Sequence, residues 1–299
     1  MDKSIVNPLV PYAYENMMRE ALLLRERYPE LIQLGSIGKS SEGRELTVLR
    51  LGDGERHVLL VGAHHGREYI SSALLMRMCE EYAGRAGLRS LWRRVSLWFV
   101  PMLNPDGVEI SIYGKSALTE KNKDFVCILG DYATWKANAR GVDLNRNYPC
   151  LFEKKRSTVL VPASEMYKGE NPASECEVQA LMAFTRQIPF CLAATFHAKG
   201  EEIFYGDSNT PETTEASLRI AEALQKECGY ALAPVSQDPG IFAAGFENWF
   251  RQEYGRPCLL LELAPFDGYI PHNMKNFDQL VWQKMRETGK ILAEWADEN

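Results

Sequence analysis

Three short apolar runs in this 299-residue chain each end at polar residues with side chains that can bind a metal ion. The runs cover residues 58–63, 190–196 and 258–261. Their aliphatic composition is typical of strands that are buried on both faces, as in parallel sheets. Ligands bind beyond the carboxyl ends of the strands in open α/β sheets. We therefore expect the residues after the three runs to meet in one crevice.

The residues that follow the runs include two histidines and two glutamates: His65, Glu68, His197 and Glu262. A catalytic zinc ion takes three protein ligands, commonly His nitrogen and carboxylate oxygen, and keeps one position open. A hydrogen-bonded core histidine is the alternative for His197. His64 makes the register of the H-x-x-E pattern ambiguous, but the residue three positions after it is an arginine, which is no ligand. We predict one zinc ion per chain, bound by His65, Glu68 and His197.

Glu262 interrupts the otherwise apolar stretch 259–266. Glutamate is almost never fully buried unless it is paired, so a structural salt bridge is one interpretation. Apolar surroundings also raise the pKa of a carboxyl group, which can then act as a general base near neutral pH. We predict that Glu262 is the general base beside the metal.

The segment 141–147 has the sequence Gly-Val-Asp-Leu-Asn-Arg-Asn. A metal-bound histidine usually donates its second N–H to a carboxylate or carbonyl, and Asp143 could orient His65 in this way. Asn145 and Arg146 could bind a substrate carboxylate, the arginine through its planar fork. An ordinary polar loop is the alternative interpretation of this segment.

Strand patterns alternate with helix patterns, which predicts an α/β fold with a mostly parallel or mixed sheet and helices on both faces. A hairpin is expected over 31–51 and a further strand over 95–100, whereas 104–173 is rich in loop residues. Expected helices cover 14–28, 70–83, 174–186 (with a capping sequence at Ser174–Glu177), 212–228, 242–254 and 277–295. No repeat or linker interrupts the sequence, so we predict a single domain over 1–299.

Composition argues against several kinds of partner. The net charge is −6 and no basic block stands out, so nucleic acid is not expected. No segment approaches the roughly 20 apolar residues of a membrane span, and residues 1–8 lack the apolar core of a signal peptide. The seven cysteines are scattered without a C-x-x-C pair, as in proteins with reduced thiols. These features predict a cytoplasmic protein without a membrane partner.

Taken together, the motifs resemble those of the zinc carboxypeptidases over nearly the whole chain, from about Tyr14 onward. They are His65-x-x-Glu68, Asn104-Pro-Asp-Gly107, the 141–147 segment, Ser174-Glu175, His197 and Glu262-Leu263. The resemblance implies a mixed, roughly eight-stranded sheet, a zinc ion and a peptide substrate. It also implies that Arg67 helps to polarise the scissile carbonyl, and that Asn145 and Arg146 face the carboxylate of the leaving residue.

Segments 135–147, 197–205 and 262–265 look most like the γ-D-glutamyl-L-diamino acid endopeptidases of this family. Those enzymes cleave the bond between γ-D-glutamate and meso-diaminopimelate (or Lys) in peptidoglycan stem peptides. Some relatives carry LysM wall-binding repeats before the catalytic domain, whereas we expect no separate wall-binding domain here, which fits a soluble muropeptide substrate. Lys136 stands where typical carboxypeptidases have an oxyanion-stabilising arginine, and Arg140 is a second candidate for that role. The tyrosine that caps the carboxypeptidase site has no counterpart in 238–241.

Glu247 gains a role through the same resemblance. In the resembling carboxypeptidases, the position two before the residue matching Trp249 lies at the bottom of the pocket for the leaving side chain. Gap-free spacing from Trp249 to Glu262 supports this placement. A carboxylate there would suit the distal ammonium of diaminopimelate or Lys, whereas a solvated helix charge is the alternative. Lys199 and Arg251 are candidates for pairing with the distal carboxylate of diaminopimelate.

The sequence is also compatible with three other functions. They are an ordinary carboxypeptidase that removes a C-terminal amino acid, a zinc deacylase of small N-acyl amino acids, and a non-catalytic binding module. The intact 143–147 and Ser174-Glu175 segments favour a peptidase over a deacylase, and the complete set of ligands and base argues against a binding module. The sequence makes no prediction about the oligomeric state.

Overall fold

The computed structural model describes residues 4–119, 131–266 and 268–299. Its centre is an eight-stranded mixed sheet with the strand order β1-β2-β4-β3-β5-β8-β6-β7. The strands are β1 (Ile32–Lys39), β2 (Glu45–Leu51), β3 (Arg56–Gly62), β4 (Val95–Val100), β5 (Phe190–Ala198), β6 (Glu202–Phe204), β7 (Ala231–Leu232) and β8 (Cys258–Leu263). The predicted α/β fold with a mixed sheet of about eight strands is confirmed.

The three apolar runs form β3, β5 and β8, which are neighbours in the sheet and run parallel to one another. Gly62 lies opposite Phe196 in the register of β3 and β5. His197 lies opposite Glu262 in the register of β5 and β8. The carboxyl ends of the three strands therefore meet at one edge of the sheet, as the sequence predicts.

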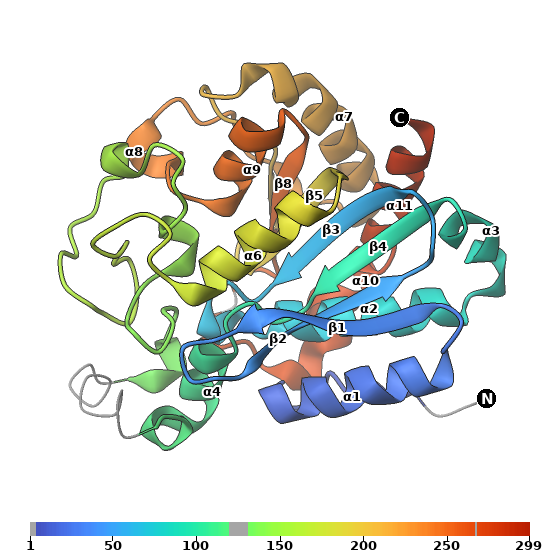
Figure 1. Cartoon of the computed structure of the whole chain (residues 1–299), viewed down its shortest axis with the longest axis horizontal. Helices are drawn as coiled ribbons and strands as arrows, with labels where there is room; N and C mark the ends of the chain where they lie inside the picture. Colours follow the sequence, from blue (N-terminus) through green and yellow to red (C-terminus); the bar gives the residue numbers. More distant parts are fainter. Residues whose placement is uncertain (1–3, 120–130, 267) are drawn as a thin grey trace.

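Helices cover both faces of the sheet, and α6 crosses it on the side opposite α2 (Figure 1). In β3, Val58 and Leu60 belong to one apolar core, and Leu59 and Val61 to the other. This division follows from the alternation of side chains along a strand. The first core includes α1 (Tyr14–Arg27), α2 (Ile70–Gly84), α7 (Pro211–Cys228) and α11 (Thr288–Glu298); the second includes α6 (Cys176–Gln187) and α9 (Phe246–Tyr254).

The helix expected over 277–295 is divided. It consists of a π-helical turn (Asp278–Trp282), α10 (Gln283–Met285) and α11. At the break, the hydroxyl of Tyr82 donates to the carbonyl of Arg286 at 2.6 Å and accepts from the N–H of Lys290 at 3.3 Å. A side chain inserted between these two backbone groups replaces a helical hydrogen bond, which accounts for the interruption.

The helix expected over 242–254 is divided as well. The short helix α8 (Pro239–Phe242) ends where the expected helix begins, and α9 starts at Phe246. Between them Ala244 has a φ of 62°. Its N–H donates to the carbonyl of Cys150, and its carbonyl accepts from the N–H of Tyr148. Contacts with a distant loop therefore hold this residue outside the helix.

The region 104–173 is less irregular than expected. It contains α4 (Pro105–Tyr113), whose first turn is capped by the Asn104 side chain, which accepts from the N–H of Gly107 at 2.9 Å. The capping sequence expected at 174–177 is wrong, because α6 starts at Cys176 without a side-chain cap. A further short helix, α3 (Arg89–Trp92), precedes β4.

Six cysteines within the described residues are free thiols, and five of these are buried. The seventh, Cys127, lies outside the described residues, as does the part of the loop-rich region between 120 and 130. None of the helices in the described ranges has the length and apolar character needed to cross a bilayer.

Candidate metal centre

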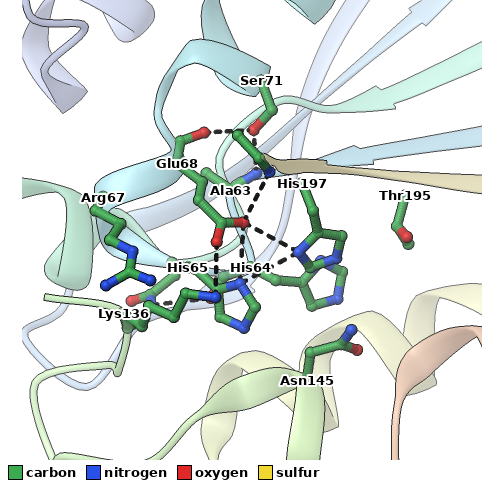
Figure 2. A network of polar contacts seen from close by, with 12 residues as sticks. Ala63, His64, His65, Arg67, Glu68, Ser71, Lys136, Asn145, Thr195 and His197 are labelled. Carbon is green, nitrogen blue, oxygen red and sulfur yellow. Dashed lines mark hydrogen bonds and ion pairs between the residues drawn. The ribbon is translucent and has the colours of Figure 1, made fainter. Parts of the chain in front are cut away.

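Three buried side chains, those of His65, Glu68 and His197, meet at the edge where β3, β5 and β8 end (Figure 2). The Nδ1 atoms of His65 and His197 lie 3.0 and 3.1 Å from Oε2 of Glu68, and 3.2 Å from each other. Ligand atoms held about 2.0–2.1 Å from a tetrahedral zinc ion are about 3.3 Å apart. The trio therefore has the composition and the separations that fit a zinc ion with one open position.

The loop after β3 turns sharply before it delivers His65. Ala63 has a φ of 42°, and its N–H donates to the hydroxyl of Ser71 at 2.9 Å. The N–H of Gly66 donates to the carbonyl of Lys136. A Cβ at Gly66 would lie 2.2 Å from the carbonyl oxygen of Gly107, so only glycine fits this close approach of two backbones.

Asn104 joins the loop of the metal ligands to the loop of Lys136. Its Nδ2 lies 3.0 Å from the carbonyl oxygen of His64, 3.2 Å from that of Lys136 and 3.1 Å from that of Ala137. The sequence motifs alone assign no role to this side chain. An asparagine directly before proline at a helix start was the available signal.

The second nitrogen of each candidate histidine ligand faces a carboxylate. His65 Nε2 lies 3.0 Å from Oδ1 of Asp143, so the structure places Asp143 where the sequence analysis expects it. Burial raises the pKa of Asp143, but the charges of His65 and Arg146 outweigh this effect and hold it well below its usual range. His197 Nε2 lies 3.8 Å from Oε1 of Glu247. Carboxylates in such positions fix the orientation of a metal-binding imidazole.

Two further charged groups stand beside the trio. Nζ of Lys136 lies 3.1 Å from Oε1 of Glu68 (Figure 2). Glu262 lies opposite His197 in the sheet register, and both burial and the charge of Glu68 raise the pKa of Glu262 to about 7. Its carboxyl group can therefore exchange a proton near neutral pH. Arg140, the second candidate for the role of Lys136, instead lies 3.7 Å from Glu175.

A cavity of about 310 Å³ opens beside these groups. Most of the predicted site residues line it: His65, Lys136, Asp143, Asn145, Arg146, Glu247 and Glu262. Arg67 is not among the lining residues, because its NH1 donates to the carbonyl of Thr134 at 3.0 Å and lies 3.4 Å from Glu165. Asn145 accepts from the N–H of Phe246 at 2.8 Å, so its amide also holds the first turn of α9.

Glu247 is 4% exposed, so its interpretation as a solvated helix charge is wrong. The hydroxyl of Thr195 donates to its Oε1, and Asn145 Nδ2 lies 3.4 Å from its Oε2. The cavity is also lined by Lys155, which the sequence analysis does not identify. It lies in an irregular segment without periodicity, so no sequence pattern indicates that it is buried.

Comparison with known proteins identifies a matching family and several relatives. Residues 17–255 match the family described as zinc carboxypeptidase. The γ-D-glutamyl-L-diamino acid endopeptidase 1 of Lysinibacillus sphaericus is 28% identical over 94% of this chain, which spans 72% of that protein. Carboxypeptidase D of Mus musculus is 28% identical over 83% of this chain, which spans 16% of that protein.

The fold is shared with solved carboxypeptidases. The crystal structure of carboxypeptidase A from Helicoverpa armigera superposes with a TM-score of 0.75 at 17% identity, covering 100% of this chain and 77% of that one. A thrombin activatable fibrinolysis inhibitor superposes with a TM-score of 0.78 at 17% identity, covering 99% of this chain and 78% of that one. The family match, the fold and the buried His-Glu-His group agree. This chain thus belongs to the zinc carboxypeptidase family and is a zinc-dependent metallopeptidase.

Proposed function

We propose that this metallopeptidase hydrolyses the bond between γ-D-glutamate and a diamino acid, meso-diaminopimelate or Lys, in peptidoglycan-derived stem peptides. The observation that carries the proposal is the buried carboxylate of Glu247 in the wall of the cavity beside the metal group. A distal ammonium of the leaving residue would neutralise this carboxylate. The printed name of the Lysinibacillus sphaericus relative supports the same substrate class.

The residues that hold and assist the metal have separate tasks in this proposal. His65, Glu68 and His197 would bind zinc, and Asp143 would keep His65 oriented. A bound zinc ion would supply Lewis acidity, which acidifies water and polarises a carbonyl. Glu262 takes the proton of the attacking water and passes it to the leaving nitrogen, as a group with a pKa of about 7 can do.

The remaining cavity residues would position the substrate. Nε of Arg146 donates to Asp143 at 3.1 Å, and its terminal nitrogens make no hydrogen bond within the described ranges, so they can bind the carboxylate of the leaving residue. Asn145 would assist Arg146. Lys136, and Arg67 from outside the cavity, would stabilise the negative charge that develops on the carbonyl oxygen.

The reaction is placed in the cytoplasm in this proposal, with soluble muropeptides as substrates. The six free cysteines of the described residues fit a reducing compartment. An ordinary carboxypeptidase is the second candidate, supported by the relationship to carboxypeptidase D and by the suitability of Glu247 for a C-terminal lysine.

A pair of tripeptides with the same leaving residue separates the two candidates. One peptide has a γ-linked D-Glu before L-Lys, and the other has an α-linked L-Glu before L-Lys. We expect a higher kcat/KM for the γ-linked peptide, with products identified by mass spectrometry. Glu262→Gln protein serves as the control for contaminating peptidases. Preference for the α-linked peptide would establish the ordinary carboxypeptidase instead.

A further inference from the structure

Lys155 carries a buried positive charge in the wall of the cavity. Its side chain is 8% exposed, and it lines the same cavity as Arg146 and Glu247. Nζ donates to the carbonyl of Ile241, and within the described ranges no carboxylate forms an ion pair with it. Asp143 and Glu247 act on this ammonium only from a distance, and burial of an ammonium without a direct ion-pair partner costs free energy. Such a group in a binding cavity indicates an anionic partner on the ligand.

The two cations considered from the sequence do not serve this purpose. Arg251 also lines the cavity, but its NH2 lies 2.6 Å from Oδ2 of Asp207 and its NH1 donates to the carbonyl of Cys258. Its charge is therefore already neutralised. Lys199 is not among the lining residues, and its Nζ donates to the carbonyl of Tyr269. Of the three cations, Lys155 is therefore the one that is suited to pair with an anionic group of the ligand.

Three of the charged side chains in the cavity wall are available to the leaving residue. Arg146 is positioned for the carboxylate next to the scissile bond, Glu247 suits an ammonium, and Lys155 suits a second anion. A leaving residue with a side chain that ends in both an ammonium and a carboxylate would match all three charges. Lysine would match only the first two and would leave the ammonium of Lys155 unpaired.

We propose that Lys155 binds the distal carboxylate of the leaving residue, so that the enzyme selects meso-diaminopimelate over lysine. This inference rests on the proposed function and narrows its substrate. Burial, aided by the charge of Arg146, lowers the pKa of Lys155 to about 8. The ammonium form therefore remains the majority at neutral pH, and a bound carboxylate would stabilise it further.

Two tripeptides that differ only in this carboxylate test the inference: L-Ala-γ-D-Glu-meso-diaminopimelate and L-Ala-γ-D-Glu-L-Lys. We expect the wild type to prefer the first by roughly 10-fold or more in kcat/KM, as a charge-assisted hydrogen bond supports. Lys155→Met, or Lys155→Gln as a second neutral variant, should remove the preference by lowering kcat/KM for the diaminopimelate peptide alone. Lys155→Arg and the exposed-neighbour control Lys154→Met should keep it.

Two results would overturn the inference: no preference in the wild type, or equal losses on both peptides in the neutral variants. If the wild type cleaves neither peptide, the proposed function fails. The role of Lys155 is then tested by calorimetry, which measures the binding of free meso-diaminopimelate and of L-lysine to the zinc-loaded protein. Tighter binding of meso-diaminopimelate that is lost in Lys155→Met supports the inference, and equal affinities overturn it.

Discussion

A substitution at Glu262 can separate proton transfer from metal binding. Replacement by glutamine keeps the shape of the side chain but removes the base, so Glu262→Gln is expected to lower kcat by roughly 10²–10⁴-fold. Zinc content should stay at the wild-type value, because Glu262 is not one of the three candidate ligands. Glu212→Gln, at an exposed position in the first turn of α7, is the control with unchanged kcat. Near wild-type turnover of Glu262→Gln would refute the assignment.

Arg146 is expected to recognise the carboxylate beside the scissile bond. Arg146→Ala should remove about 1.5–3 kcal/mol of transition-state binding on a substrate with a free carboxylate. The measured kcat/KM on that substrate should fall accordingly. The loss should shrink when that carboxylate is amidated. Arg140→Ala is the control, because Arg140 lies by Glu175 and does not line the cavity. Equal losses on the acid and the amide would show that Arg146 only holds Asp143 in place.

Glu247 could select an ammonium of the substrate or orient His197, and one substitution can distinguish these two roles. If it selects an ammonium, Glu247→Gln should lower kcat/KM about 10-fold or more for a diaminopimelate or Lys substrate relative to a norleucine substrate. If its main role is to orient His197, whose Nε2 lies 3.8 Å away, both substrates should lose equally. Kinetics on the matched pair decide, with Glu222→Gln on the exposed side of α7 as control.

The position of a site residue can be predicted from the sequence where that residue directly follows a patterned strand. His65, His197 and Glu262 meet because β3, β5 and β8 are adjacent and parallel. Lys155 was missed because its burial depends on the distant turn at Ile241. Thr195 was missed because a buried strand residue shows no sign of the carboxylate it contacts.

At the scale of elements, the patterned strands and long helices were predicted, whereas interruptions and very short strands were not. The division before α11 depends on Tyr82, which lies 204 positions before Arg286 in the chain, and no local pattern reveals it. β6 and β7 have three and two residues, too few for a period to show. α4 was predictable, since Asn104 and Pro105 form a standard helix start.

The first turn of α6 contains a buried carboxyl that should make stability depend on pH. Burial, followed by the charge of Asp106, raises the pKa of Glu177 to about 7. An unfolded chain binds that proton with a pKa of about 4.3, so the native state holds more protons between these values. The free energy of unfolding should therefore fall as pH rises from about 4.3 to 7.

Glu177→Gln removes this titration. Relative to wild type, the variant should gain stability as pH rises from 5 to 8, as measured by urea unfolding at several pH values. Glu253→Gln, at an exposed position on α9, is the control and should follow the wild-type profile. Parallel profiles of Glu177→Gln and wild type would show that the Glu177 carboxyl does not titrate in this range.

For the whole molecule, zinc should act as a folding ligand. An ion that binds only the native state at 100 times its Kd adds about 2.7 kcal/mol. For a chain of this size, chelation should lower Tm by on the order of 5 °C or more, and added zinc should restore it. His197→Ala should not respond to zinc, while His57→Gln, a substitution remote from the group, should respond like wild type. Calorimetric melting curves with and without chelator provide the measurement.

The strand ends that supply the metal ligands and Glu262 also determine when hydrolytic activity can begin. Glu68 and His197 are 129 positions apart, and Glu262 follows only on the next parallel strand. Long-range parallel pairing forms slowly, because the connecting chain must close before the contacts stabilise it. A growing chain on the ribosome has two of the three ligands long before the third emerges. Because Glu262 on β8 emerges after all three ligands, we expect a growing chain to lack activity until β8 has joined the sheet.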